Sequence, residues 1–263
     1  MTMKQMIKCV LWVLLNFALQ FIVQVAMSIY AVAQGMRDDA VLNAWLMDNL
    51  LLTTLISNVI FIAIAGAVFA GKKVRLFPDS EREKHLGVCI VPCVAAFLYS
   101  LGFSLLFEGN SAMIQNSVEY YSEKVSWLGT IMMVVDLLIL APIAEELLCR
   151  RIMLDGLKKR YSSLVAVVIS AVIFGAMHIM AGGPALAIGA AVMGLLLGMV
   201  YVLTGSLRAA IIVHAAANLP DFLLSVVTLP EGTISAVIAA VCLAAAVLLM
   251  LWWSRHHHLN SGD

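Results

Sequence analysis

Eight long apolar segments constrain the fold of this chain more than any other feature of its sequence. A helix needs about 20 mostly apolar residues to cross the hydrocarbon core of a bilayer. The segments lie at roughly 9–33, 44–70, 87–107, 127–149, 162–180, 184–204, 207–228 and 234–254. They predict an all-α, polytopic membrane protein, a bundle of eight transmembrane helices in a single integral domain over residues 1–263.

The composition excludes the main alternatives. Hydrophobic residues make up 63% of the chain and charged residues only 12%, whereas about a quarter of the residues are charged in an ordinary soluble domain. A soluble fold of this size would leave too much apolar surface in water. The balance of 16 basic and 16 acidic residues gives no indication of nucleic-acid binding. The five cysteines, odd in number and without a CxxC pair, predict free thiols rather than disulfides.

The basic residues predict the orientation of the helices. If the N-terminus is cytoplasmic, only Arg37 and Lys124 of the Lys and Arg residues fall in segments on the outer side. Positively charged residues concentrate in cytoplasmic segments, so both chain ends are expected in the cytoplasm. Ala31-Val32-Ala33 resembles a signal-peptide cleavage site. However, the apolar run before it is longer than a signal-peptide core, which favours an uncleaved anchor.

The fourth apolar segment carries two adjacent carboxylates, Glu145 and Glu146. Arg150 lies four residues after Glu146, so the two side chains share a helix face and can pair. Glu145 points about 100° away and can face a cavity. The alternative is that both acids mark the cytoplasmic membrane interface. Asp136 lies nearly opposite Glu145 on the same helix and is expected to have a partner on a neighbouring helix.

Two other segments contribute polar side chains. The fifth ends at Phe174-Gly-Ala-Met-His178, and the seventh contains His214-Ala-Ala-Ala-Asn218, whose two polar residues share one helix face. Hydrogen bonding between helices would account for them without any chemistry. Together with the two glutamates, they form a set expected of a site that activates water for hydrolysis.

Two further features qualify this set. Two histidines and a glutamate are also a zinc ligand set, so a zinc ion would use Glu145, His178 and His214. No HExxH motif is present, however, and Asn218 is a poor zinc ligand. In addition, His214 lies about 9 Å and His178 about 27 Å from the nearest basic segments at 1.5 Å per residue. A common site therefore requires tilted or broken helices. Gly194 and Gly198 in the sixth segment predict close helix packing.

The motifs EExxxR at 145–150, FxxxH at 174–178 and HxxxN at 214–218 resemble those of the CPBP intramembrane proteases. That family includes CAAX prenyl endopeptidases of the Ras-converting type and bacterial proteins linked to bacteriocin processing and self-immunity. The resemblance covers a core of about residues 127–230 and implies a helical bundle with an intramembrane cavity.

The resemblance also implies roles for the motif residues. Glu145 would activate the hydrolytic water with help from His178. His214 and Asn218 would stabilise the oxyanion, and Glu146 and Arg150 would support the site. A reaction without a metal or other cofactor is favoured.

We therefore expect an endopeptidase in a bacterial cell membrane that cuts a hydrophobic, membrane-associated peptide or protein near the cytoplasmic leaflet. One alternative is a non-catalytic membrane protein that binds and regulates a partner, as in bacteriocin self-immunity. Another is a proton-coupled transporter, for which Asp136 would matter as much as Glu145.

Overall fold

The computed structural model describes residues 3–77, 86–108, 127–224 and 232–260, and these residues contain helices but no β-strand. The helices are α1 (Met3–Ala33), α2 (Asp39–Asp48), α3 (Leu50–Gly71), α4 (Ile90–Phe103), α6 (Trp127–Val135), α7 (Ala141–Glu146), α8 (Asp155–Leu157), α9 (Ser163–Met177), α10 (Ile179–Thr204), α11 (Leu207–Leu224) and α12 (Thr233–Asn260). π-Helical stretches at Asp136–Leu140 and Leu147–Leu154 join α6, α7 and α8 into one continuous span. The all-α prediction is confirmed.

Within the described residues, seven helical spans are long and apolar enough to cross a membrane, one fewer than predicted. They are Ile7–Ala33, Leu50–Gly71, Gly87–Phe107, Trp127–Leu157, Ile179–Thr204, Leu207–Leu224 and Thr233–His256. The exception is the fifth predicted span, 162–180, which forms only the 15-residue helix α9. At 1.5 Å per residue, α9 is roughly 22 Å long and shorter than the hydrocarbon core.

Helix α9 ends at Met177, and the helical path is interrupted again a few residues later, inside α10. Helical geometry is lost at Gly182 and Gly183, and Gly183 has a positive φ of 71° that glycine adopts without strain. Pro184 then opens the long part of α10. The two helices pack antiparallel and very closely, since a Cβ atom at Gly194 would lie 3.0 Å from the Cα of Ala171. This confirms the predicted packing role of the small residues in α10.

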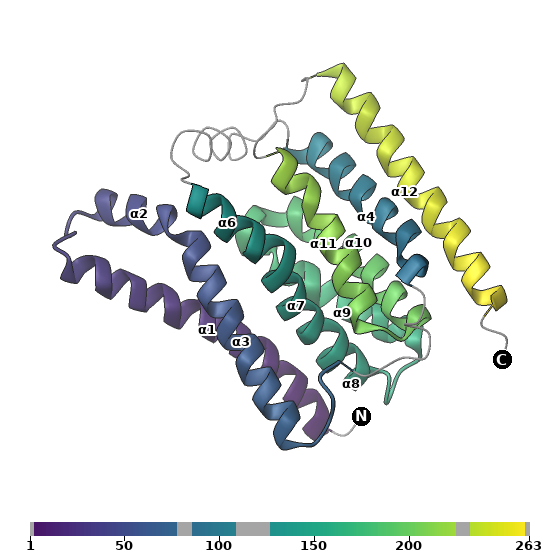
Figure 1. The fold of residues 1–263 in the computed structure, drawn as a ribbon, viewed down its shortest axis with the longest axis horizontal. Coiled ribbons are helices and arrows are strands. Elements are labelled where there is room, and N and C mark those ends of the chain that lie inside the picture. The colour runs from purple at the N-terminus through teal and green to yellow at the C-terminus, as the bar shows by residue number, and fades with distance from the viewer. Residues whose placement is uncertain (1–2, 78–85, 109–126, 225–231, 261–263) are drawn as a thin grey trace.

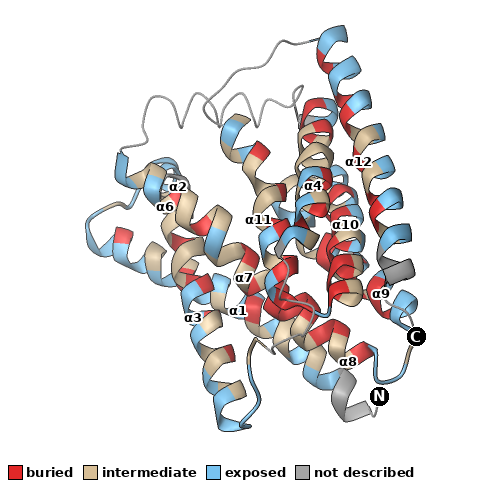
Figure 2. Ribbon diagram, turned by 45° about the vertical axis from the view of Figure 1, so that its right-hand side comes forward, coloured by how far each residue is buried: buried red, intermediate tan, exposed pale blue. Residues whose placement is uncertain are grey.

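The helices form a bundle in which α1 and α3 lie on one side and α4 and α12 on the other (Figure 1). The span α6–α8, together with α9, α10 and α11, lies between these pairs. Buried residues gather on the inward faces (Figure 2). Large apolar side chains such as Phe21, Leu164 and Met180 face outward, as expected where lipid replaces water. All five cysteines are free thiols, as predicted.

The bundle has two ends that differ in charge. We call one the basic end, where α1, α4 and α11 begin and α12 finishes; the opposite one is the far end. Three contacts bring segments together at the basic end: Cys9 with the carbonyl of Ile152, Trp253 with that of Val88, and Arg151 with that of Arg75. Three of the Lys and Arg residues that were used to predict the orientation lie outside the described residues, namely Arg82, Lys84 and Lys124.

Candidate active site

Glu145 and Glu146 end α7 and point to different surroundings. Pro142 lies in the first turn of this helix, where its missing N–H is tolerated. The side chain of Glu146 is completely buried, whereas that of Glu145 is 24% exposed. Because neighbouring helical residues differ by about 100° in direction, one carboxylate enters the core while the other stays partly exposed.

The buried Glu146 links two of the motifs. Its Oε1 accepts hydrogen bonds from Nη1 of Arg150 and from Nδ1 of His214, both at 2.8 Å. Arg150 also donates from Nη2 to the carbonyl of Gly194 at 2.9 Å and lies 5.0 Å from the centre of the Phe174 ring. The expected Glu146–Arg150 pair is confirmed, and it connects the fourth span with α9, α10 and α11.

Glu145 meets both histidines. Its Oε2 lies 3.7 Å from Nε2 of His214 and 4.0 Å from Nε2 of His178. These distances exceed direct hydrogen bonds, so a water molecule or carbonyl oxygen close to the carboxylate would also be within reach of the imidazoles. The other nitrogen of each ring, Nδ1, has its own partner. Nδ1 of His178 is 2.8 Å from the carbonyl of Phe174, and Nδ1 of His214 is hydrogen-bonded to Glu146. Both Nε2 atoms therefore face the carboxylate of Glu145.

The shared contact with Glu145 accounts for the depth mismatch counted from the sequence. His178 follows the start of α9 by 15 residues, and His214 follows the start of α11 by seven. If α9 and α11 were parallel and began at the same depth, the two histidines would differ in depth by roughly 12 Å. Since both reach the same oxygen, α9 and α11 must differ in tilt or in starting depth.

A polar pocket of about 110 Å³ opens beside the two histidines. Asn218 lines it, and its Nδ2 donates one hydrogen to the carbonyl of Leu137 at 2.9 Å. Four polar lining residues were not predicted from the sequence: Tyr99, Ser100, Ser104 and Asp221. Ser104 donates to the carboxylate of Asp221 at 3.1 Å. The first three lie in or directly after α4, whose sequence holds no charged residue to draw attention to it.

Asp136 does not join this site. It is buried and accepts hydrogen bonds from Thr54 Oγ1 at 2.7 Å and from Asn58 Nδ2 at 2.9 Å, both on α3. The expected partner on a neighbouring helix is confirmed. Asp136 thus has a structural role in holding α3 against the fourth span.

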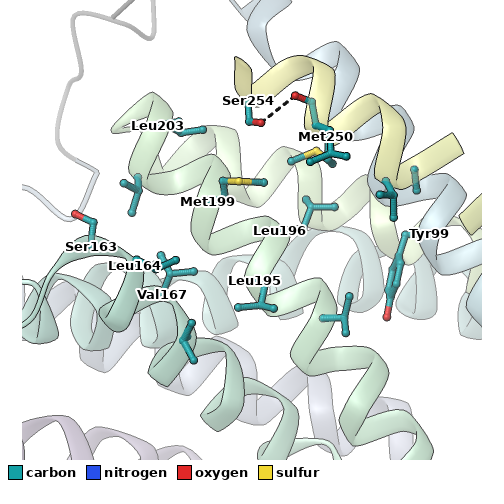
Figure 3. Close-up of a pocket in the computed structure, with 16 residues that line it drawn as sticks. Tyr99, Ser163, Leu164, Val167, Leu195, Leu196, Met199, Leu203, Met250 and Ser254 are labelled. Carbon is teal, nitrogen blue, oxygen red and sulfur yellow. Dashed lines mark hydrogen bonds between the residues drawn. The ribbon is translucent and has the colours of Figure 1, made fainter. Parts of the chain in front are cut away.

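A long apolar groove of about 700 Å³ runs beside the polar pocket, between α9, α10 and α12 (Figure 3). Its α10 wall is formed by residues such as Leu195, Leu196 and Met199, which lie nearer the basic end than the α10 residues of the polar pocket. Tyr99 lines both cavities and donates to the carbonyl of Gly189 at 2.9 Å. Tyr99 therefore lies at the boundary between the groove and the pocket.

Among the residues that the structure describes, no group of three or more His, Cys, Asp or Glu side chains is arranged to hold a metal ion. The carboxylate of Glu145 lies within 4.0 Å of the imidazoles of His178 and His214.

Comparisons with known proteins give one match. Residues 127–220 match the family model described as type II CAAX prenyl endopeptidase Rce1-like. This segment contains all three motifs, and the match confirms the resemblance. No curated protein and no solved structure matches the chain. The matched description names prenyl endopeptidases, so a link to bacteriocins has no support from these comparisons.

Proposed function

We propose that this chain is an intramembrane protease, because residues 127–220 match the family model described as type II CAAX prenyl endopeptidase Rce1-like. It hydrolyses a peptide bond in a hydrophobic, membrane-associated peptide or protein. The observation that carries the proposal is the position of Glu145 Oε2 between the Nε2 atoms of His178 and His214. A base beside two potential proton donors is what hydrolysis of an amide requires.

In the proposed mechanism, Glu145 takes a proton from a water molecule that His178 helps to orient. The water oxygen then forms a bond with the scissile carbonyl carbon. Negative charge develops on the carbonyl oxygen and is stabilised by His214 and Asn218. Collapse of the tetrahedral intermediate breaks the C–N bond, and Glu145 returns the proton to the leaving amine, so that no other reactant is needed.

Glu146 and Arg150 support the reaction without touching the substrate. The bond from His214 Nδ1 to Glu146 orients the ring and places a negative charge beside it. A protonated ring presents an N–H at Nε2, which is the donor that an oxyanion needs. Arg150 fixes Glu146 in turn. This makes both residues positioning residues for His214.

The apolar groove supports a hydrophobic substrate. Tyr99 lines both the groove and the polar pocket. An apolar segment lying in the groove would therefore bring its polar end close to the pocket and its two histidines. Such a segment gains little from water exclusion within a bilayer, and its recognition rests on close packing. The groove is thus proposed to bind the membrane-embedded part of the substrate.

The test of the function is a comparison of membrane peptides and proteins from cells with the natural protein and from cells with Glu145→Gln. We expect a precursor to accumulate in the Glu145→Gln cells and its fragments to be lost. The two proteins must be present in the membrane in equal amounts. Identical peptide profiles would contradict the proposed protease activity and favour a binding or regulatory role.

Filling the groove should weaken substrate binding. Replacing Leu196 by tryptophan places a large ring in the groove. We expect KM to rise about tenfold with kcat changed much less, because the lost contacts would bind the substrate and the transition state equally well. Val241→Trp is the matched control, because Val241 is 62% exposed on α12 and does not line the groove. Equal effects of the two substitutions on KM would contradict the assigned binding surface.

Removal of metal ions should leave the enzyme active. After dialysis of the purified protein against a strong chelator, we expect about 80% or more of the initial rate, since the proposed base is a carboxylate rather than a zinc-bound water. The check is the cleavage rate together with the metal content of the same sample. Loss of a stoichiometric metal in parallel with activity, with recovery on its return, would overturn the metal-free mechanism.

A further inference from the structure

The backbone carbonyl of Leu137 lies within a helical span but accepts its hydrogen bond from another helix. The donor is Nδ2 of Asn218 on α11, at 2.9 Å. A carbonyl inside a helix normally accepts from the N–H four residues later, or five residues later in a π-helix. For Leu137 these two positions are Ala141 and Pro142. Neither of them donates to it.

The two helical donors are missing for different reasons. The N–H of Ala141 donates to the carbonyl of Asp136, five residues earlier, where the π-helical stretch ends. The next N–H in this register would belong to residue 142, but proline has none. Pro142 is buried within a membrane span. A backbone group that a proline frees at such a place is satisfied by a neighbouring helix, and Asn218 is that partner for Leu137.

The bond to Leu137 fixes the orientation of the Asn218 amide. A carbonyl oxygen can only accept, so the NH₂ group of the amide and not its oxygen must face Leu137. Nδ2 carries two hydrogens, and the one that Leu137 does not take is left for another acceptor. Asn218 lines the polar pocket together with His214, the other residue assigned to the oxyanion. The amide is therefore held as a donor beside the pocket.

We propose that Pro142 is a positioning residue for Asn218. Because it lacks an N–H, it leaves the carbonyl of Leu137 to Asn218, and the amide keeps its second N–H for the oxyanion. Pro142 itself touches no reacting atom. The inference rests on the proposed protease function. It extends that function to a residue outside the three motifs, three positions before Glu145.

Replacing Pro142 by alanine restores the missing N–H and should divert the Leu137 carbonyl from Asn218. We expect kcat to fall about tenfold with KM changed less than about twofold, because an oxyanion donor acts in the transition state. Asn218→Ala should lower kcat about 100-fold. In the Asn218→Ala protein, Pro142→Ala should then change kcat by less than about twofold, since the side chain that it would displace is absent.

Two controls separate the N–H from the proline ring. Pro184→Ala should leave kcat within about twofold of the natural value, because Pro184 follows the break in α10 and an N–H there has no helical carbonyl to reach. Lactic acid at position 142, introduced by nonsense suppression, has the side chain of alanine but an ester oxygen in place of the N–H. We expect it to restore kcat to within about threefold of the natural value, because Leu137 again lacks a helical donor.

The unfolding equilibrium tests the same link without cleavage. In a denaturing-detergent titration, Asn218→Ala should raise the unfolding constant of the natural chain about tenfold, since it leaves the Leu137 carbonyl without a donor. In the Pro142→Ala chain the same substitution should raise it less than about threefold, because the N–H of residue 142 now satisfies that carbonyl.

Equal effects of Asn218→Ala in the two chains would overturn the inference. An unchanged kcat for Pro142→Ala, or a kcat with lactic acid as low as that with alanine, would also overturn it. Failure of the Pro142→Ala protein to fold would do the same, because it would give Pro142 a role in folding rather than in positioning. Coupled stabilities without any Glu145-dependent cleavage would contradict the protease function alone, so the two failures are distinguishable.

Discussion

Replacing Glu145 by glutamine should lower kcat of the purified protein by about three orders of magnitude. General base catalysis contributes roughly 10²–10⁴-fold, and glutamine keeps the shape of the side chain but cannot accept the proton of the attacking water. The side chain is partly exposed and has no direct hydrogen-bond partner to lose, so the folded protein should persist. The measurement is the rate of cleavage, in detergent or in lipid vesicles, of the substrate found by the peptide comparison.

Asp136→Asn is the matched control for this result. Asp136 is a second carboxylate of the same span, and it is bound to Thr54 and Asn58 rather than to the histidines. We expect its substitution to change kcat by less than about threefold, because the residue has no part in the proposed chemistry. A loss at Asp136 equal to that at Glu145 would favour a proton relay and hence a transporter. A Glu145→Gln protein with more than a tenth of the natural rate would contradict the role of Glu145 as base.

Most of the fold could be predicted from the lengths of the apolar segments, because a bilayer imposes the same length on every crossing helix. Helix α9 is the exception. An apolar run shows which residues avoid water, but it does not show where a helix within that run ends. Helix α9 ends at Met177, and Gly182 and Gly183 interrupt α10, both within a continuous apolar stretch. The separation of α2 from α3 at Asn49 escaped prediction for the same reason.

The candidate site, like the fold, could be predicted only in part. Helical spacing was enough to pair Glu146 with Arg150 and to turn Glu145 away from that pair, so that its side chain is partly exposed. It could not place Tyr99 or Ser104 in the pocket, because α4 approaches α11 only through tertiary packing. Nor could it show that His214 is bonded to Glu146, since the two residues are 68 positions apart in the chain.

The second large effect is expected on stability, at the buried ion pair of Glu146 and Arg150. Arg150→Met should destabilise the protein by about 3–5 kcal/mol, since it leaves the carboxylate of Glu146 in the core without its cation. The carboxylate keeps only the bond from His214, and its Oε2 has no partner even in the natural protein. The measurement is the free energy of unfolding in a denaturing-detergent titration.

The double variant Glu146→Gln/Arg150→Met distinguishes loss of charge pairing from loss of packing. Removing both charges is often nearly neutral when the shapes are retained, and the glutamine oxygen can still accept the hydrogen bond from His214. We therefore expect the double variant to recover most of the lost stability, whereas a purely steric defect at position 150 would remain. Cleavage should stay low in the double variant despite its recovered stability, because a neutral glutamine in place of Glu146 removes the negative charge beside the His214 ring. Full activity in that variant would remove Glu146 from the positioning of His214 and leave the pair with a role in folding alone.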